Sequence, residues 1–181
     1  DVEVFYFGDL GVKETVDPGF GEKVKWDVPL LDGYRSTFLS KVPVQNLQRV
    51  RIPQVDDFLL EKRFDLVFLH GYTHRFARQL VKRRKKFGYR VVLRGEFTDM
   101  KLIGARWWKS AARQLYLRWF YRRVDHFCPI GADAVDHLTR CGVDRQRMTR
   151  TPYAVDDMLI KKMGRSVRRE DTRSDLNISA D

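Results

Sequence analysis

The sequence predicts an α/β fold, in which a Rossmann-like, mostly parallel sheet is flanked by helices. Short runs of apolar, β-forming residues alternate with helical patterns, and successive runs lie roughly 25–35 residues apart, as in βαβ units. The chain has 181 residues, of which 43% are hydrophobic, and this is enough for one domain with a buried core. In such a sheet, ligands bind beyond the carboxyl ends of the strands.

The first third of the chain combines short strands with a long loop. Residues 2–7 (VEVFYF) are mostly β-branched and aromatic, and we expect a strand there. Residues 8–31 contain repeated Gly and Pro, which predicts a long structured loop. A short strand is expected over residues 36–39. The pattern after Pro53 predicts a helix over residues 54–63.

The middle of the chain has the clearest βαβ pattern. Residues 65–70 (DLVFLH) form a run typical of a buried strand, which ends at Gly71. Residues 73–87 carry apolar side chains along one helical stripe, and Gly88 ends this helix. The next strand is predicted over residues 90–93.

The last part of the chain continues the alternation. We expect helices over residues 105–124 and 132–140, and strands over residues 125–130 and 148–153. From residue 161 the sequence is polar, with enough helical pattern for one or two turns. We therefore predict a Rossmann-like domain over residues 1–160 and a polar linker or tail over residues 161–181.

Positive charge is concentrated in one block. The net charge is +11, yet residues 75–123 hold 16 basic side chains and only two acidic ones, while the remainder has a net charge of −3. Such a block predicts an anionic neighbour: a phosphate-rich ligand, a membrane surface or nucleic acid. We do not expect nucleic acid, because no zinc-finger spacing, RNA-recognition signature or helix-turn-helix pattern accompanies the block.

Other classes of protein find no support. There is no run of roughly 18 apolar residues and no secretory signal. Cys128 and Cys141 do not make a disulfide framework and indicate a reducing cytosol.

His137 lies four residues before Cys141, and His126 lies near Cys128, but we expect these residues in the core and predict no metal site. Walker, Gly-x-Ser-x-Gly and Gly-x-Gly-x-x-Gly motifs are absent from the sequence.

The predicted strand ends supply candidate cleft residues. His70 is a candidate to hydrogen-bond a ligand hydroxyl, and the alternative is an ordinary strand-end histidine. The Arg94 guanidinium suits a phosphate or carboxylate, and Glu96 suits a hydroxyl, whereas the alternative is a local ion pair that caps the turn. The full set at this edge is His70, Gly71, Tyr72, Arg94, Gly95, Glu96 and Gly131.

The long loop adds an aromatic and acidic group. Trp26 and Tyr34 are candidates to contact a sugar ring, and Asp27 is a candidate to hydrogen-bond its hydroxyls. The alternative is that Trp26 and Tyr34 fix the loop onto the core. Loops of this length are often functional.

The long basic helix is predicted to have one core-facing side and one outer side. We assign Trp107, Trp108, Ala111, Ala112, Leu115 and Trp119 to the core. Aromatic residues interleaved with Arg on an outer face suit an anionic membrane surface, and the alternative is burial beneath another segment. The candidates for this membrane surface are Arg106, Lys109, Arg113, Leu117, Phe120 and Tyr121.

Several short motifs follow one another along nearly the whole chain. The first group is residues 17–21 (DPGFG), Trp26-Asp27, Leu30-Leu31 and Gly33-Tyr34. The second group is His70-Gly71-Tyr72, Leu93-Arg94-Gly95-Glu96, Pro129-Ile130-Gly131, Cys141-Gly142-Val143 and Pro152-Tyr153-Ala154-Val155-Asp156. In order and spacing, these motifs resemble a subset of glycosyltransferase family 4.

The resemblance implies the GT-B fold, in which two Rossmann-like halves face each other across a cleft. The acceptor would bind largely to the first half and the nucleotide sugar largely to the second, with retention of configuration and no required cofactor or metal. Compared with the family, the chain opens at the second strand and stops where the second half should begin. We therefore expect an incomplete acceptor-side domain that is inactive alone. Several family members carry a His where this chain has Arg94.

The predicted function is that of a family 4 glycosyltransferase acting in polysaccharide biosynthesis. It would transfer a sugar from a nucleotide-sugar donor to a saccharide or lipid-linked acceptor. The predicted location is the cytoplasm, with peripheral contact at the inner face of the membrane. The alternative is a non-catalytic basic module that binds an anionic membrane surface or a partner protein.

Overall fold

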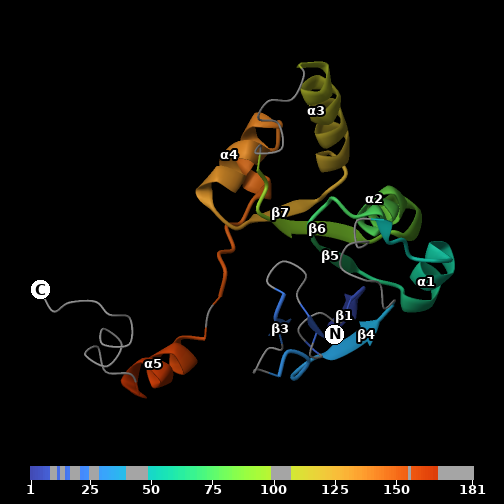
Figure 1. The fold of residues 1–181 in the computed structure, drawn as a ribbon. Coiled ribbons are helices and arrows are strands. Elements are labelled where there is room, and N and C mark those ends of the chain that lie inside the picture. Colours follow the sequence, from blue (N-terminus) through green and yellow to red (C-terminus); the bar gives the residue numbers. More distant parts are fainter. Residues whose placement is uncertain are drawn as a thin grey trace, which may run out of the picture. The chain divides into compact units, whose positions relative to one another are not determined.

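The computed structural model describes residues 1–8, 12, 15–16, 21–24, 29–39, 49–98, 107–154 and 156–166. The chain divides into two compact units, residues 1–151 and residues 152–181 (Figure 1). The described part of the second unit contains one helix, α5 (Asp157–Ser166). Every site residue predicted from the strand ends lies in the first unit.

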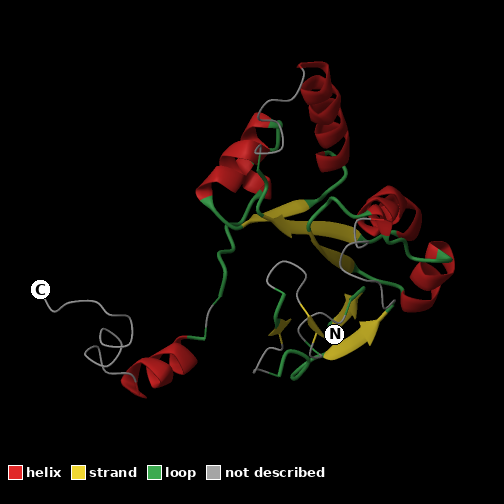
Figure 2. Cartoon of the chain, in the orientation of Figure 1, coloured by secondary structure: helices red, strands yellow, loops and turns green. Residues whose placement is uncertain are grey.

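A three-stranded parallel sheet forms the centre of the first unit. It has the order β5-β6-β7, with β5 (Leu66–His70) beside β6 (Arg90–Gly95) and β6 beside β7 (His126–Pro129). Helices α2 (Arg75–Phe87) and α3 (Trp107–Tyr121) connect these strands (Figure 2). The predicted α/β architecture, with a parallel sheet flanked by helices, is confirmed.

The N-terminal residues form a second parallel pair. Strand β1 (Glu3–Tyr6) pairs with β4 (Arg35–Phe38), where strands were expected. Between them, β2 (Thr15–Val16) and β3 (Lys23–Val24) form a short antiparallel ladder that the loop prediction missed. Two-residue strands carry too little periodicity to be recognised in a Gly- and Pro-rich stretch.

Aromatic packing joins the N-terminal strands to the helices. The Phe5 ring meets the edges of Phe58 and Phe64 at 5.2 and 5.8 Å, and Phe7 stacks on Phe76 at 4.2 Å. Phe58 belongs to α1 (Val55–Lys62), the helix expected after Pro53. The first unit therefore has one continuous hydrophobic core.

The end of the first unit departs slightly from the prediction. Helix α4 (Ala132–Arg140) is followed by a 3-10 turn, η3 (Arg145–Arg147). The strand expected over residues 148–153 is an extended segment with one bridge, between Met148 and Phe127. The N–H groups of Thr149 and Thr151 donate to the β7 carbonyls of Phe127 and Pro129 at 2.9 Å. The segment follows β7 without forming a full ladder.

The orientation predicted for the long helix is wrong. Leu117, Phe120 and Tyr121, expected on an outer membrane-binding face, are at most 1% exposed. Trp107 and Leu115, expected in the core, are 82% and 68% exposed. Together with Val124, the three buried residues follow the i, i+3, i+4, i+7 spacing of one helical stripe. Tyr121, which belongs to this stripe, packs edge-on against Phe127 of β7, with 5.4 Å between the ring centroids. This packing determines which face of α3 points into the core.

Candidate functional site

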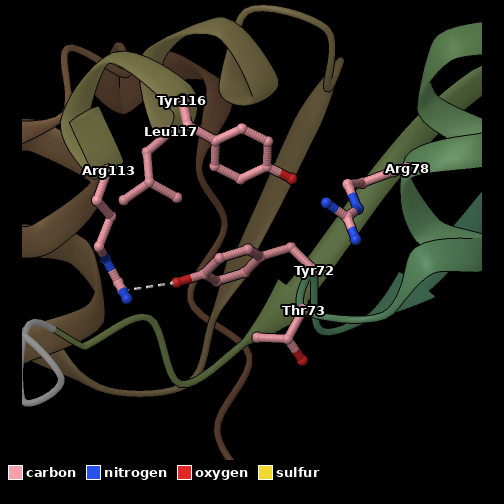
Figure 3. A pocket seen from close by; sticks show the side chains of 6 residues that line it. All are labelled: Tyr72, Thr73, Arg78, Arg113, Tyr116 and Leu117. Atoms are coloured by element: carbon pink, nitrogen blue, oxygen red, sulfur yellow. Dashed lines mark hydrogen bonds between the residues drawn. The ribbon is translucent and has the colours of Figure 1, made fainter. Parts of the chain in front are cut away.

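Two adjoining cavities lie beyond the carboxyl ends of β5 and β6, and Figure 3 shows the residues that line the first of them. The first has a volume of about 180 Å³ and the second about 190 Å³. The first is lined by Tyr72, Thr73, Arg78, Arg113, Tyr116 and Leu117. The second is lined by Gly71, Tyr72, Thr73, Gly95, Glu96, Phe97, Thr98 and Arg113. Tyr72, Thr73 and Arg113 form the wall that the cavities share.

Gly71 makes the turn that brings the chain from β5 to the cavity wall. Its φ angle is +75°, a region that glycine enters without strain, and its N–H donates to the Arg94 carbonyl at 2.9 Å. This bond extends the β5–β6 ladder by one residue past His70. The turn delivers Tyr72 and Thr73 to the carboxyl edge of the sheet.

The Tyr72 ring is held by aromatic neighbours. It stacks on Phe97 at 6.1 Å and contacts the rings of Phe120 and Tyr121 at 6.1 and 5.9 Å. Phe120 and Tyr121 are core residues of α3. Two χ angles and three ring contacts leave the Tyr72 hydroxyl little freedom, so it is a fixed polar group on the wall of both cavities.

Arg113 projects from α3 toward this hydroxyl. Its Nη2 donates to the Tyr72 oxygen at 3.1 Å and to the Thr98 carbonyl at 3.4 Å. Its Nε is buried and has no hydrogen-bond partner among the described residues. Arg113 was predicted to face a membrane, and the structure instead places it on the wall of both cavities.

Arg78 contributes a second guanidinium to the first cavity, from α2. Tyr116 lines the same cavity; burial raises the pKa of its hydroxyl, and the charge of Arg78 opposes this rise. Figure 3 shows Arg78 and Arg113 approaching the cavity from different helices. Sequence reasoning missed Arg78 and Tyr116, because neither lies at a strand end.

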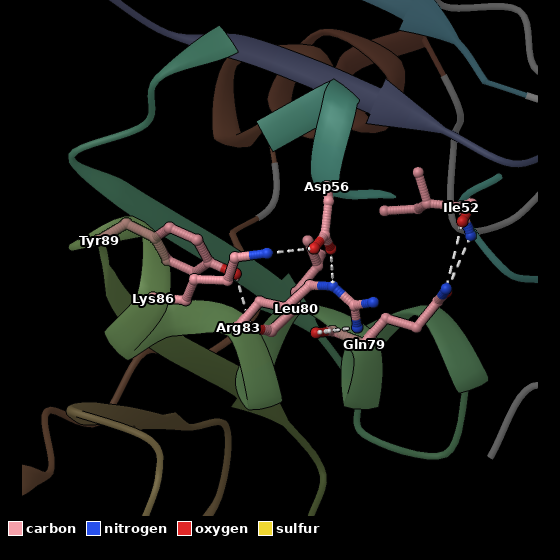
Figure 4. A network of polar contacts seen from close by, with 7 residues as sticks. All are labelled: Ile52, Asp56, Gln79, Leu80, Arg83, Lys86 and Tyr89. Atoms are coloured by element: carbon pink, nitrogen blue, oxygen red, sulfur yellow. Dashed lines mark hydrogen bonds and ion pairs between the residues drawn. The ribbon is translucent and has the colours of Figure 1, made fainter. Parts of the chain in front are cut away.

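A polar network holds α2 against the segment that precedes it (Figure 4). Gln79 accepts the Ile52 N–H at 2.9 Å and donates to the Ile52 carbonyl at 3.2 Å. Asp56 of α1 accepts hydrogen bonds from Arg83 and Lys86, and these bonds lower the pKa of its carboxyl group. Because Arg78 precedes Gln79 on the same helix, this network fixes the backbone from which the Arg78 side chain extends.

His70 and Arg94 are brought together, but away from the two cavities. They are partners in the β5–β6 register. Since side chains alternate along a strand, both project from the face opposite to Leu69 and Leu93, which belong to the buried core. Partial burial of the imidazole, followed by the charge of Arg94, lowers the pKa of His70. Arg94 also donates to the Thr151 carbonyl at 3.4 Å.

The remaining predicted residues are dispersed. Gly71, Tyr72, Gly95 and Glu96 line the cavities, whereas Gly131 precedes α4 and lines neither. The Tyr34 hydroxyl donates to the Leu30 carbonyl and lies 2.5 Å from the Tyr6 hydroxyl, contacts that favour a structural role. Burial and then Tyr34 raise the pKa of Tyr6 to about 12. Trp26, Asp27, Arg106 and the Lys109 side chain lie outside the described residues.

The histidines and cysteines considered for a metal site have other neighbours. His137 is 1% exposed, and its Nε2 lies 3.3 Å from the Tyr121 hydroxyl and 3.6 Å from the Cys141 sulfur. The His126 ring contacts the Thr149 hydroxyl at 2.9 Å. Within the part of the chain that the structure describes, no group of three or more His, Cys, Asp or Glu residues is placed to hold a metal ion.

A parallel α/β sheet with polar cavities at its carboxyl edge is the architecture of a ligand-binding Rossmann-like domain. The family model for the glycosyl transferase 4-like domain matches residues 21–154, and the chain belongs to this glycosyltransferase family. A search of curated proteins found no match. Among the described helices, none is both long and apolar enough to cross a membrane.

Proposed function

We propose that this domain binds the acceptor in a retaining glycosyltransferase. The sugar would come from a nucleotide sugar, and the acceptor would be a saccharide or a lipid-linked saccharide. The observation that carries the proposal is the pair of cavities at the carboxyl edge of β5 and β6, in a chain of the glycosyltransferase 4-like family. Such an edge is where open α/β sheets bind their ligands.

The cavities suit the task of holding a hydroxyl-bearing acceptor. Glu96 lines the second cavity and can accept a hydrogen bond from a hydroxyl, while the Tyr72 and Thr73 hydroxyls can both donate and accept. In the reaction, the domain orients one acceptor hydroxyl toward the anomeric carbon of the donor sugar. Because both reactants are bound, the attack becomes effectively unimolecular. A donor-binding half supplies the groups that stabilise the leaving nucleotide. The proposal requires no resident metal or organic cofactor, and it places the protein in the cytoplasm.

The test is a transfer assay on the protein as its source cells make it. Nucleotide sugars are combined with saccharide and lipid-linked acceptors, and the configuration of the product is read by NMR. We expect transfer with retention, and no transfer by residues 1–181 alone. An inverted product contradicts the retaining mechanism. Transfer by residues 1–181 alone contradicts the need for a donor-binding half.

An exposed face on α3 favours a second function, docking on an anionic membrane. Trp107 and Leu115 are 82% and 68% exposed, Trp108 is also exposed, and the exposed Arg118 follows on the same helix. Exposed tryptophan, leucine and arginine side chains on one helix suit the boundary between headgroups and acyl chains. This face replaces the buried residues Leu117, Phe120 and Tyr121 as the candidate surface.

Vesicle flotation tests this second function. We expect binding to phosphatidylglycerol vesicles and not to phosphatidylcholine vesicles. Replacing Trp107 and Leu115 together by Ser should weaken binding at least tenfold, since burying each side chain contributes about 1.5–3 kcal/mol. Leu60→Ser is the control, because Leu60 is 60% exposed but belongs to α1. Equal losses in both variants would show that general surface hydrophobicity, and not this face, drives binding.

A further inference from the structure

We propose that the first cavity is an oxyanion site, which takes a phosphate or carboxylate group of the acceptor. Arg113 binds the oxyanion from the wall shared with the second cavity, and Arg78 adds a second positive charge from α2. The assignment to an acceptor rests on the proposed function, whereas the anion site itself rests only on the cavity. The two parts can therefore be tested separately.

The charge balance of the cavity is the first observation. Among the described residues, no carboxylate forms an ion pair with Arg78 or Arg113, although Arg83, Lys86 and Arg84 on α2 all pair with aspartates. Arg78 and Arg113 are both half-buried, where an uncompensated charge is costly. An oxyanion in the cavity supplies the missing negative charge.

The unused hydrogen-bond donors of Arg113 are the second observation. Its Nη2 is occupied by Tyr72 and Thr98, which fix the guanidinium plane. Its Nε is buried without a partner among the described residues. With Nη2 occupied, the fixed guanidinium still carries its positive charge, and its remaining N–H groups can donate single charge-assisted hydrogen bonds to a phosphate or carboxylate. The Tyr72 and Thr73 hydroxyls on the same wall can add neutral hydrogen bonds.

The second cavity differs from the first in the charge of its lining residues. The two cavities therefore suit chemically different parts of the acceptor. Glu96 lines only the second cavity, where its carboxylate oxygens can accept hydrogen bonds from hydroxyls. Arg78 lines only the first cavity. An acceptor that fills both cavities therefore carries its anionic group next to Arg78 and Arg113 and its hydroxyl groups next to Glu96. This predicts selection of charged acceptors over neutral sugars.

The binding experiment uses calorimetry on the 181-residue chain without any donor. Inorganic phosphate is titrated in one arm and acetate in the other, so that the stronger binder identifies the preferred oxyanion. We expect saturable binding of at least one, weakened at least tenfold by Arg113→Gln and by Arg78→Gln. Arg122→Gln is the matched control, because Arg122 is exposed directly after α3 and lines neither cavity.

The outcomes separate the site from a merely basic surface. If Arg122→Gln weakens binding as much as Arg113→Gln, or if neither anion binds, the anion site is wrong. Circular dichroism melts confirm that each variant is folded, and Arg78→Gln provides a second test if Arg113→Gln does not fold. Anion binding without sugar transfer by the source protein would leave the site intact and overturn the proposed function instead.

Discussion

His70 and Arg94 are neighbours, and the positive charge of Arg94 disfavours protonation of the His70 imidazole. They end adjacent parallel strands in register, and partial burial together with the guanidinium lowers the pKa of His70. The imidazole is therefore mainly neutral at pH 7, and one of its ring nitrogens can accept a hydrogen bond from a hydroxyl. Because neither residue lines the described cavities, a catalytic contribution from His70 requires a ligand that reaches the opposite face of the sheet.

Removing the charge of Arg94 should raise the pKa of His70. In Arg94→Gln the repulsion of the protonated imidazole is lost, so the ring binds its proton at higher pH. An NMR titration of the His70 ring protons measures the change. Arg90→Gln, at the other end of β6, is the control and should leave the titration unchanged. A lower pKa for His70 in Arg94→Gln would contradict this account of the pair.

At the scale of elements, α3 links the core to the cavity wall. Its buried stripe packs on the sheet and on Tyr72, while Arg113 extends from the same helix to the Tyr72 hydroxyl. A rotation of α3 by one residue, about 100°, would expose Phe120 and remove Arg113 from the cavities. The orientation of this single helix therefore decides both the packing of the domain and the presence of the charged wall.

Substitutions on the two faces of α3 should have very different costs. Phe120→Ala removes a side chain with 0% exposure, and we expect it to lower the free energy of unfolding by about 3–5 kcal/mol. Leu115→Ala, on the exposed face, should change the free energy by no more than about 0.5 kcal/mol. Urea unfolding measures both. A larger loss of stability in Leu115→Ala than in Phe120→Ala would support the helix orientation predicted from the sequence.

At the scale of the whole molecule, the described sheets leave strand edges unpaired. β5 is hydrogen-bonded only to β6, and β1 only to β4, within the part of the chain that the structure describes. Leu66 and Phe68 on β5 are each 49% exposed. An apolar strand with an open edge is a template for pairing with another chain.

The chain studied alone should therefore self-associate, and a charge on β5 should reduce this. We expect Phe68→Lys to lower light scattering on heating, because a lysine beside an open edge opposes strand pairing. Leu60→Lys adds the same charge at a similarly exposed position on α1. If both variants lower the scattering equally, net charge and not the β5 edge controls the association.

Strong local patterns account for what could be predicted. Strands β5, β6 and β7 are dense apolar runs, and glycines such as Gly71 and Gly88 mark the ends of elements, so the sheet and its carboxyl edge were found. Tyr72 and Glu96 were found for the same reason. Arg78 and Tyr116 were missed, because each lies within a helix. Whether such a side chain faces the cavity depends on how the helix is oriented about its axis in the folded domain. Two apolar stripes compete on α3, and only tertiary packing against β7 selects one.

The aromatic ring of Tyr72 belongs to two environments at once. The Tyr72 ring packs against the buried rings of Phe120 and Tyr121, while Tyr72 also forms part of the wall that the two cavities share. A substitution that repacks these core rings would therefore also move the hydroxyl and the Arg113 side chain bonded to it. Under the proposed function, substitutions in the interior of this domain would therefore change acceptor preference as well as fold stability.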